Sequence, residues 1–228
     1  ATARAMVAGK VRNSRSVLLR GAREAADPRE AETLTRAAED LAAALRALPS
    51  ALDLDTLRGF EGEAARGYFA ALNLIVKPQA RAVFGLDGRT RRPPRDRFNA
   101  LISFLYSMLM NDCRSAAEAV GLDPQLGYLH AVRPGRAALA LDLQEEFRSV
   151  LVDRFALTLI NRGQLNARDF DEREGGAVML NDPGRRLVVA AWQERKQEEI
   201  LHPLLDSKVP LALLPLVQAR LLARTLRG

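Results

Sequence analysis

The sequence predicts an all-α protein, mostly helical, with one small β-hairpin near residues 165–180. Apolar side chains recur every three or four positions along most of the 228 residues, which is the period of an amphipathic helix. Prolines and glycines gather between these stretches and mark where helices end. Only residues 165–180 alternate weakly instead, around Gly175-Gly176, which is typical of two short strands joined by a turn.

The first half of the chain predicts three helices followed by a loop. Residues 2–24 form a basic helix, or a helix plus a linker, and residues 28–48 form an amphipathic helix that Pro49 ends. Asp53 or Asp55 caps a third helix that continues to about residue 76. Residues 77–95 are rich in arginine, glycine and proline, which indicates a loop.

The second half predicts four more helices. Residues 96–120 form a long helix that ends at Gly121, and a short connection follows over residues 126–136. The stretch 139–161 is apolar nearly all round, so we expect a continuous, central and buried helix. The last two helices are expected at 183–200 and 209–227.

Basic charge is concentrated in two segments. The chain carries 34 Lys and Arg against 28 Asp and Glu, a net charge of +6. Residues 1–23 hold six basic side chains and no acidic one, and residues 77–97 hold seven basic and two acidic ones. Such segments favour a polyanionic partner such as nucleic acid, although solvated surface loops would look the same.

The composition excludes several classes of protein. The longest uncharged apolar stretch, Val209 to Val217, contains two prolines and is too short to span a bilayer, so no membrane association is expected. A single cysteine, Cys113, excludes a disulfide framework and a cysteine-based zinc site, and it fits a reducing, cytoplasmic compartment.

One carboxylate falls where a buried stripe is expected. With Leu54 at 0° on a helical projection, Glu61 lies at about 340°, in the middle of the apolar stripe, and Glu63 lies at about 180°, on the opposite face. A buried carboxylate needs a partner, which a metal, an arginine or a histidine would supply. A structural ion pair is an equally good interpretation of Glu61.

Two further polar groups are candidates for the same chemistry. His130 lies between two predicted helices and is one of two histidines, although a lone histidine is more often structural. Asp142, Glu145 and Glu146 cluster in one helix, where periodicity does not decide which acid points inward, and Asp142 also suits a first helical turn.

A carboxylate, an imidazole and a second carboxylate would suit Mg²⁺ or Mn²⁺. Such a metal beside Arg133, Arg136 and Arg148 is what phosphodiester chemistry requires, and no protein nucleophile is then needed. No nucleophile elbow, phosphate-binding loop or dinucleotide fingerprint is present.

Several segments together resemble the CRISPR-associated integrase-endonuclease of the spacer-acquisition module, the "Cas one" family. The resemblance extends over residues 1–226 and rests on five stretches: Lys10-Val-Arg-Asn-Ser-Arg, Leu57-Arg-Gly-Phe-Glu-Gly-Glu, Arg92-Pro-Pro with Asp96-Arg-Phe-Asn-Ala-Leu, Gly121-Leu-Asp-Pro with Gly127-Tyr-Leu-His, and Leu141-Asp-Leu-Gln-Glu-Glu-Phe-Arg.

The resemblance implies a role for particular residues. Glu61, His130 and Glu145 are the implied metal ligands and catalytic residues, binding Mg²⁺ or Mn²⁺. Asp142 and Tyr106 match supporting positions. Packing beside a long helix explains Tyr106 equally well. The DNA-binding residues that we expect from charge and from the resemblance are Arg89, Arg91, Arg92, Arg133, Arg136 and Arg148.

The resemblance also implies an activity and partners. It predicts a prokaryotic, metal-dependent DNA integrase and endonuclease, in which a 3′-hydroxyl of captured DNA attacks a phosphodiester of a CRISPR array. Family members usually begin with a β-rich domain that forms a homodimer. We therefore expect residues 1–24 to be a basic linker or helix after such a domain, and residues 25–228 to be the metal-binding catalytic domain.

The expected partners are DNA, a small ferredoxin-like CRISPR-associated subunit and, in some systems, a RecB-type nuclease. The alternatives are a nonspecific metal-dependent nuclease acting on branched DNA, and a noncatalytic helical DNA-binding scaffold in which the three polar groups form structural pairs.

Overall fold

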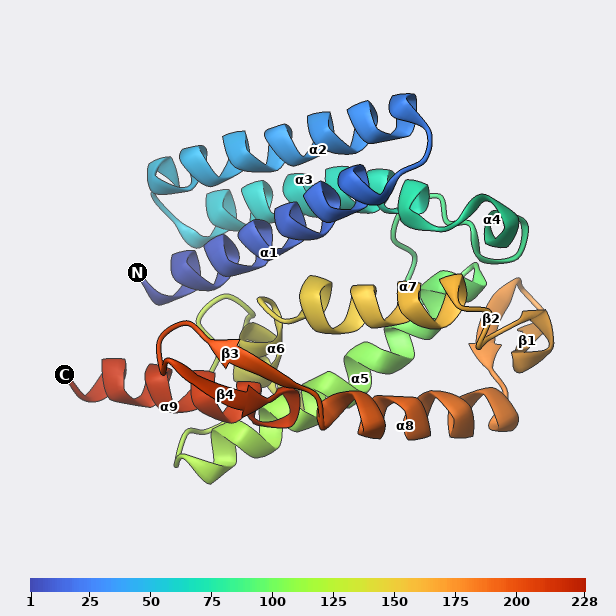
Figure 1. Cartoon of the computed structure of the whole chain (residues 1–228). Helices are drawn as coiled ribbons and strands as arrows, with labels where there is room; N and C mark the ends of the chain where they lie inside the picture. Colours follow the sequence, from blue (N-terminus) through green and yellow to red (C-terminus); the bar gives the residue numbers. More distant parts are fainter. The chain divides into compact units, whose positions relative to one another are not determined.

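The computed structural model describes residues 1–228 and confirms a mostly helical protein (Figure 1). Its helices are α1 (Thr2–Glu24), α2 (Pro28–Ala47), α3 (Leu54–Leu72), α4 (Pro78–Phe84), α5 (Arg97–Ala119), α6 (Ala138–Gln144), α7 (Arg154–Asn161), α8 (Asp182–Lys196) and α9 (Leu214–Arg227). Its strands are β1 (Phe170–Arg173), β2 (Ala177–Leu180), β3 (Glu199–His202) and β4 (Ser207–Pro210), which pair as two antiparallel hairpins.

The chain divides into two compact units. The first unit contains residues 1–106 and 145–180, and the second contains residues 107–144 and 181–228. Each unit is therefore built from two separate stretches of chain, and α5 contributes residues to both.

Three long helices form the first part of the first unit. Helices α1, α2 and α3 lie side by side, and each packs against the other two (Figure 1). Val7 and Leu18 on α1 and Leu34 on α2 are fully buried. Residues 2–24 form one helix, as one of the two alternatives for this segment predicted, and the apolar stripe of α1 packs on its neighbours while the basic side chains alternate with that stripe.

Helix α3 begins where the sequence predicted. The side chain of Asp53 accepts a hydrogen bond from the backbone N–H of Thr56, so Asp53 and not Asp55 is the N-cap. The expected loop over 77–95 is wrong in its first part, which forms α4. Pro78 occupies the first turn of α4, where a missing N–H costs nothing, and Phe84 is buried.

The predicted hairpin is confirmed. Strands β1 and β2 pair with Phe170 opposite Leu180 and Arg173 opposite Ala177. The turn between them contains Gly175 and Gly176, whose φ angles of 81° and 73° lie in the region that side chains with a Cβ rarely adopt.

The continuous helix expected over 139–161 is interrupted. Helix α6 ends at Gln144, residues 145–147 form a turn, and a π-helical segment, η3 (Arg148–Asp153), leads into α7. An apolar pattern carries no signal for such an insertion. π-Helical turns are rare in proteins as a whole, but those that occur are often found at functional sites. Residues 148–153 are therefore a candidate functional region.

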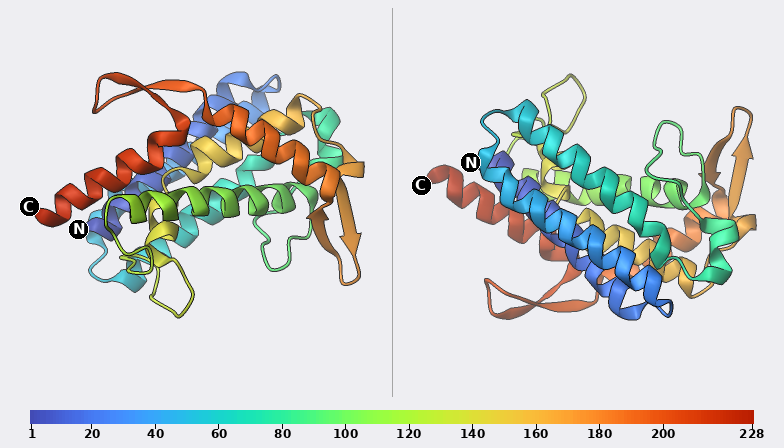
Figure 2. Two further views of the ribbon diagram at one scale, coloured as in Figure 1. Left: turned by 90° about the horizontal axis from the view of Figure 1, so that it is seen from below. Right: turned by 90° about the horizontal axis from the view of Figure 1, so that it is seen from above.

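The second unit contains α6, α8, α9 and the hairpin β3–β4. Helix α6 packs against α9, and α8 packs against the 3₁₀ turn Leu211–Leu213 that precedes α9. The predicted helices at 183–200 and 209–227 are too long, because residues 199–202 and 207–210 pair as strands. This hairpin extends away from the neighbouring helices of its unit (Figure 2).

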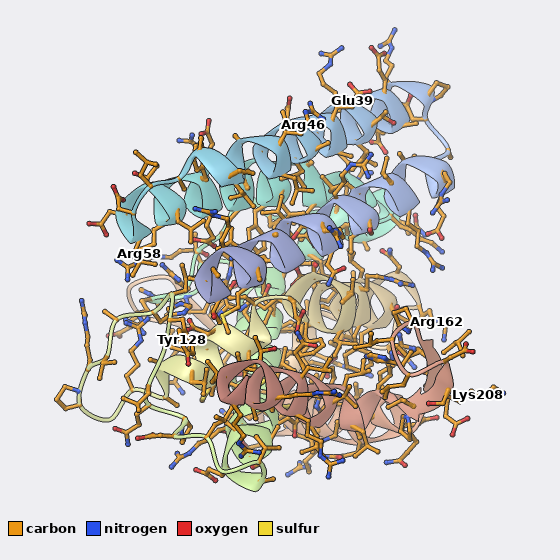
Figure 3. The ribbon with its side chains drawn as sticks, turned by 90° about the vertical axis from the view of Figure 1, so that its left-hand side faces the viewer. Glu39, Arg46, Arg58, Tyr128, Arg162 and Lys208 are labelled. Carbon is orange, nitrogen blue, oxygen red and sulfur yellow. The ribbon has the colours of Figure 1, made fainter.

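The surface of α2 illustrates how charge is kept in solvent. Glu39 and Arg46 are exposed, and their side chains lie on the outer face of α2, away from α1 and α3 (Figure 3). No helix has both the length and the apolar character that crossing a membrane would require.

Candidate metal centre

Two of the predicted ligands share one cation in the first unit. Glu61 on α3 and Glu145 in the turn after α6 both contact the ammonium of Lys10 on α1. The Lys10 Nζ atom lies 2.6 Å from Glu145 Oε2 and forms a short ion pair with Glu61 Oε1. Glu63 is exposed and Glu61 is partly buried, as the helical projection predicted.

The second oxygen of Glu145 binds a different cation. Arg148 Nη1 lies 2.9 Å from Glu145 Oε1, and the Glu145 side chain is only 3% exposed. The Arg148 guanidinium stacks over the Tyr106 ring, 4.9 Å from its centroid. Burial opposes the charge of Arg148, but Glu145 and the neighbouring Tyr106 and Glu61 outweigh it and hold its pKa above the usual value.

A buried aspartate lies behind the same tyrosine. Asp153 Oδ1 accepts a 2.6 Å hydrogen bond from the Tyr106 hydroxyl, and Oδ2 accepts a 2.9 Å bond from Tyr68. Burial raises the pKa of Asp153 to about 6, although the two phenols oppose the shift. Burial, together with the nearby Asp153, raises the pKa of both tyrosines well above 10.0. Tyr106 is therefore a hydrogen-bonded support as well as a packing residue.

Arg89 does not belong to a free basic loop. Its guanidinium donates to Asn99 Oδ1 at 2.7 Å and to Ser103 Oγ at 2.9 Å. It also lies over the rings of Phe69 and Tyr106, and burial lowers its pKa. Arg89 is therefore partly buried and held by contacts within the first unit, and its expected contact with DNA stays a prediction.

The other predicted DNA-binding arginines differ in exposure. Arg91 and Arg92 are exposed in the first unit, and Arg133 is exposed in the second. Arg136 is partly buried. Their contact with DNA stays a prediction.

Helix α1 holds the turn that carries Glu145. The side-chain amide of Asn13 donates a 2.8 Å hydrogen bond to the carbonyl of Glu146. A Cβ at Gly9 would lie 3.3 Å from the Cβ of Glu146, so a residue without a side chain lets α1 approach closely. Burial raises the pKa of Glu146 to about 7. Gly9, Lys10 and Asn13 together place α1 against this turn.

His130 and Asp142 form a pair in the second unit. The ring Nδ1 of His130 lies 2.6 Å from Asp142 Oδ1. The same carboxylate accepts backbone hydrogen bonds from Tyr128, Leu129 and His130, at 2.5, 2.9 and 3.0 Å. Asp142 therefore fixes the loop and, through Nδ1, the imidazole ring, as the carboxylate does in carboxylate–histidine–metal arrangements.

The predicted site residues are thus divided between the units. The first unit brings together Glu61, Glu145, Arg148 and Tyr106, and the second holds His130 and Asp142. Within neither unit do three His, Cys, Asp or Glu side chains group as a metal site would require. A site with all three ligands, Glu61, His130 and Glu145, stays a prediction.

Sequence reasoning missed four residues of the first unit. Lys10 and Asn13 stand in one of the stretches that carried the family resemblance, so a signal was present, but Lys10 counted only as surface charge. Tyr68 gave no signal, because a tyrosine is an ordinary member of an apolar stripe. Asp153 gave the same kind of signal as Glu61, a lone carboxylate in a stretch expected to be buried, but it was not singled out.

The donors of the first unit fit a hard divalent cation. Carboxylate oxygens are the donors that Mg²⁺ and Mn²⁺ prefer, and the first unit brings two such side chains to one positive charge. The contact with Lys10 shows that the two carboxylates already meet at a single cationic atom.

A sequence model of the family described as CRISPR associated protein Cas1 matches residues 1–194. The chain belongs to the Cas1 family. The CRISPR-associated endonuclease Cas1 1 of Moorella thermoacetica is 58% identical over 228 residues, which are 100% of this chain and 66% of that protein. The CRISPR-associated endonuclease Cas1 of Leptospira interrogans is 46% identical over 99% of this chain and 88% of its own length.

Solved structures agree with this Cas1 assignment. The Cas1 protein TM1797 from Thermotoga maritima aligns with a TM-score of 0.83 at 31% identity, over 99% of this chain and 65% of that one. A chain of a Cas6-RT-Cas1–Cas2 complex aligns with a TM-score of 0.81 at 28% identity, over 99% of this chain and 23% of its own. The chain therefore spans slightly less than two thirds of the length of several Cas1 relatives.

Proposed function

We propose that this Cas1 chain catalyses divalent-metal-dependent DNA strand transfer, by which a 3′-hydroxyl of captured DNA is joined to a CRISPR array. The observation that carries the proposal is the meeting of Glu61 and Glu145 about one cation, in a chain whose relatives are named endonucleases. We also propose the family's small CRISPR-associated subunit and a RecB-type nuclease as partners. The similarity to a chain of a Cas1–Cas2 complex, and a relative that is a Cas4/Cas1 fusion, support these partners.

Each residue has a distinct task in the proposed reaction. Glu61, Glu145 and the Nε2 atom of His130 would hold Mg²⁺ or Mn²⁺, which when bound polarises a phosphodiester oxygen and activates the attacking hydroxyl. Asp142 keeps the His130 ring in one orientation through its Nδ1 atom. Arg148 occupies Glu145 Oε1 and thereby limits the rotation of that carboxylate.

Arginine side chains supply the phosphate contacts. The exposed Arg91, Arg92 and Arg133 are suited to bind DNA phosphates, which positions the strand without reading its sequence. No side chain of the chain needs to act as a covalent nucleophile, because the attacking group is the hydroxyl of the incoming DNA.

A plasmid assay tests the proposal. Supercoiled plasmid, short DNA with free 3′-hydroxyl ends and Mn²⁺ are incubated with the chain and the small partner subunit. Glu61→Gln, Glu145→Gln and His130→Ala should each abolish joined products, whereas Glu63→Gln on the exposed face of α3 should not. Nicked or linear plasmid without joined DNA would instead favour a nonspecific nuclease.

DNA binding separates the remaining alternative. Glu61→Gln and Glu145→Gln should leave DNA affinity largely intact, because a carboxylate carries the same sign of charge as a phosphate and does not attract it. A wild-type chain that binds DNA but neither cleaves nor joins it with Mn²⁺ or Mg²⁺ would identify a noncatalytic scaffold. Full joining by either folded glutamine variant would overturn the assignment of the ligands.

A further inference from the structure

Lys10 has no role in the proposed reaction, yet it contacts both proposed carboxylate ligands of the first unit. Its ammonium pairs with Glu61 Oε1 and lies 2.6 Å from Glu145 Oε2. The Lys10 side chain is only 13% exposed, so solvent screens these contacts weakly. Lys10 therefore occupies the space between the two carboxylates that a shared metal ion would need.

The two cations at Glu145 differ in how firmly they are held. The Arg148 guanidinium contacts Glu145 and also stacks on Tyr106, so a second interaction fixes its position. The Lys10 ammonium ends a flexible four-carbon chain, and its contacts are with Glu61 and Glu145. A metal that enters would displace Lys10 from Oε2, while Arg148 could remain on Oε1.

The backbone of α1 aims Lys10 at this position. Asn13, one turn further along α1, is hydrogen-bonded to the carbonyl of Glu146, and Gly9 permits the close approach to the same turn. The root of the Lys10 side chain is therefore anchored on both sides, and only its flexible end is able to move. This arrangement makes exchange of the ammonium possible without movement of α1.

Electrostatics explains why a cation is needed there in the absence of metal. Two partly buried carboxylates that converge on one point repel each other and lose solvation, and a positive charge between them offsets both effects. A divalent ion would supply the same compensation with two charges, but it requires the same oxygens. The ammonium and the metal are therefore mutually exclusive at this point.

We propose that Lys10 is a built-in competitor of the metal, which fills the cation position between Glu61 and Glu145 until a divalent ion displaces it. The inference rests on the proposed function, because it takes both carboxylates as metal ligands. It predicts that Lys10 stabilises the metal-free fold and lowers the affinity for the metal. The site would then load only when the free metal concentration is high enough to overcome the ion pairs.

Metal binding by the Lys10→Met variant tests the proposal. Mn²⁺ affinity is measured by titration calorimetry and by the electron paramagnetic resonance of free Mn²⁺, in wild type and variant. Lys10→Met should bind Mn²⁺ on the order of tenfold more tightly, since it removes partly buried ion pairs of ordinary strength. Its thermal midpoint should be lower in EDTA, and Mn²⁺ should raise that midpoint more than in wild type.

A matched control removes the effect of net charge. Arg12→Met makes the same charge change two residues away on an exposed face of α1 and should leave Mn²⁺ affinity unchanged. Equal or weaker Mn²⁺ binding by Lys10→Met than by wild type would overturn the competitor role. So would an equal gain in Arg12→Met, because the effect would then be one of general charge.

Three further variants distinguish failure of the competitor role from failure of the proposed function. If Glu61→Gln and Glu145→Gln leave wild-type Mn²⁺ binding unchanged, the proposed function fails, and not the competitor role alone. If Lys10→Met is unfolded in EDTA, Lys10→Arg replaces it, because the guanidinium keeps a competing charge. The Mn²⁺ affinity of Lys10→Arg should then be no higher than that of wild type, and a higher affinity would refute the competitor role.

Discussion

The buried carboxylate of Asp153 allows a quantitative test of the support beneath the candidate site. It accepts hydrogen bonds from Tyr68 and Tyr106 at 2.9 and 2.6 Å, and burial raises its pKa from 3.8 to about 6. Asp153→Asn removes the ionisable group and keeps a side chain of the same shape. The amide oxygen can still accept from one phenol, and its NH₂ group can donate to the other.

The sign and size of the effect follow from linkage. The folded-state pKa is raised, so the protonated carboxyl favours the folded state, and stability is lost as pH rises from about 4 to about 6. A shift of about two units corresponds to about 3 kcal/mol in total, of which about 1.4 kcal/mol is lost between pH 5 and pH 8. Asp153→Asn has no ionisable group at this position, so its folding stability does not fall with pH for this reason.

Urea denaturation followed by circular dichroism at pH 5 and pH 8 provides the measurement. The free energy of unfolding of Asp153→Asn, relative to wild type, should increase by about 1.4 kcal/mol between the two pH values. Asp40→Asn, an exposed aspartate on α2, serves as the control and should show no comparable change. A difference between Asp153→Asn and wild type that is constant or shrinks with pH would refute the reasoning.

Three further predictions concern other residues of the two units. Tyr106→Phe should cost about 1–2 kcal/mol of folding stability in urea titrations, and more at pH 8 than at pH 5, because an ionised Asp153 then loses a donor. Arg91→Gln combined with Arg92→Gln should lower the salt dependence of DNA binding by up to about two units of slope, measured by fluorescence anisotropy. Asp142→Asn should speed amide hydrogen exchange over residues 128–130, because three backbone N–H groups share that carboxylate.

Most elements of the fold were predictable, because they depend on local signals. The Asp53 side chain caps a helix that begins one residue later, and the apolar stripe of residues 2–24 repeats every three or four residues. Both signals can be read from neighbouring positions in the sequence. The errors fall where distant segments decide. Residues 199–210 read as parts of two helices, but they form a hairpin, and η3 interrupts a stretch whose apolar pattern gave no reason for a break.

The candidate site was predictable only in part, for a related reason. A carboxylate within an apolar stripe identified Glu61, because the stripe defines an inward direction. The stretch 139–161, which contains Glu145, is apolar nearly all round and defines no inward direction, so the family resemblance was needed to choose that residue. Lys10 could not be identified as a partner of either glutamate, because the contacts join positions 51 and 135 residues apart.

The π-helical segment explains how one tyrosine supports both Arg148 and Asp153. Residues five apart on a regular α-helix are about 140° apart around the axis and face different directions. In a π-helix, hydrogen bonds join residues five apart, so Arg148 and Asp153, at the two ends of η3, come onto the same side. Tyr106 then receives the Arg148 guanidinium on its ring and donates its hydroxyl to Asp153. Because Arg148 also holds Glu145, the irregular helix fixes a proposed metal ligand that a regular helix would leave without this support.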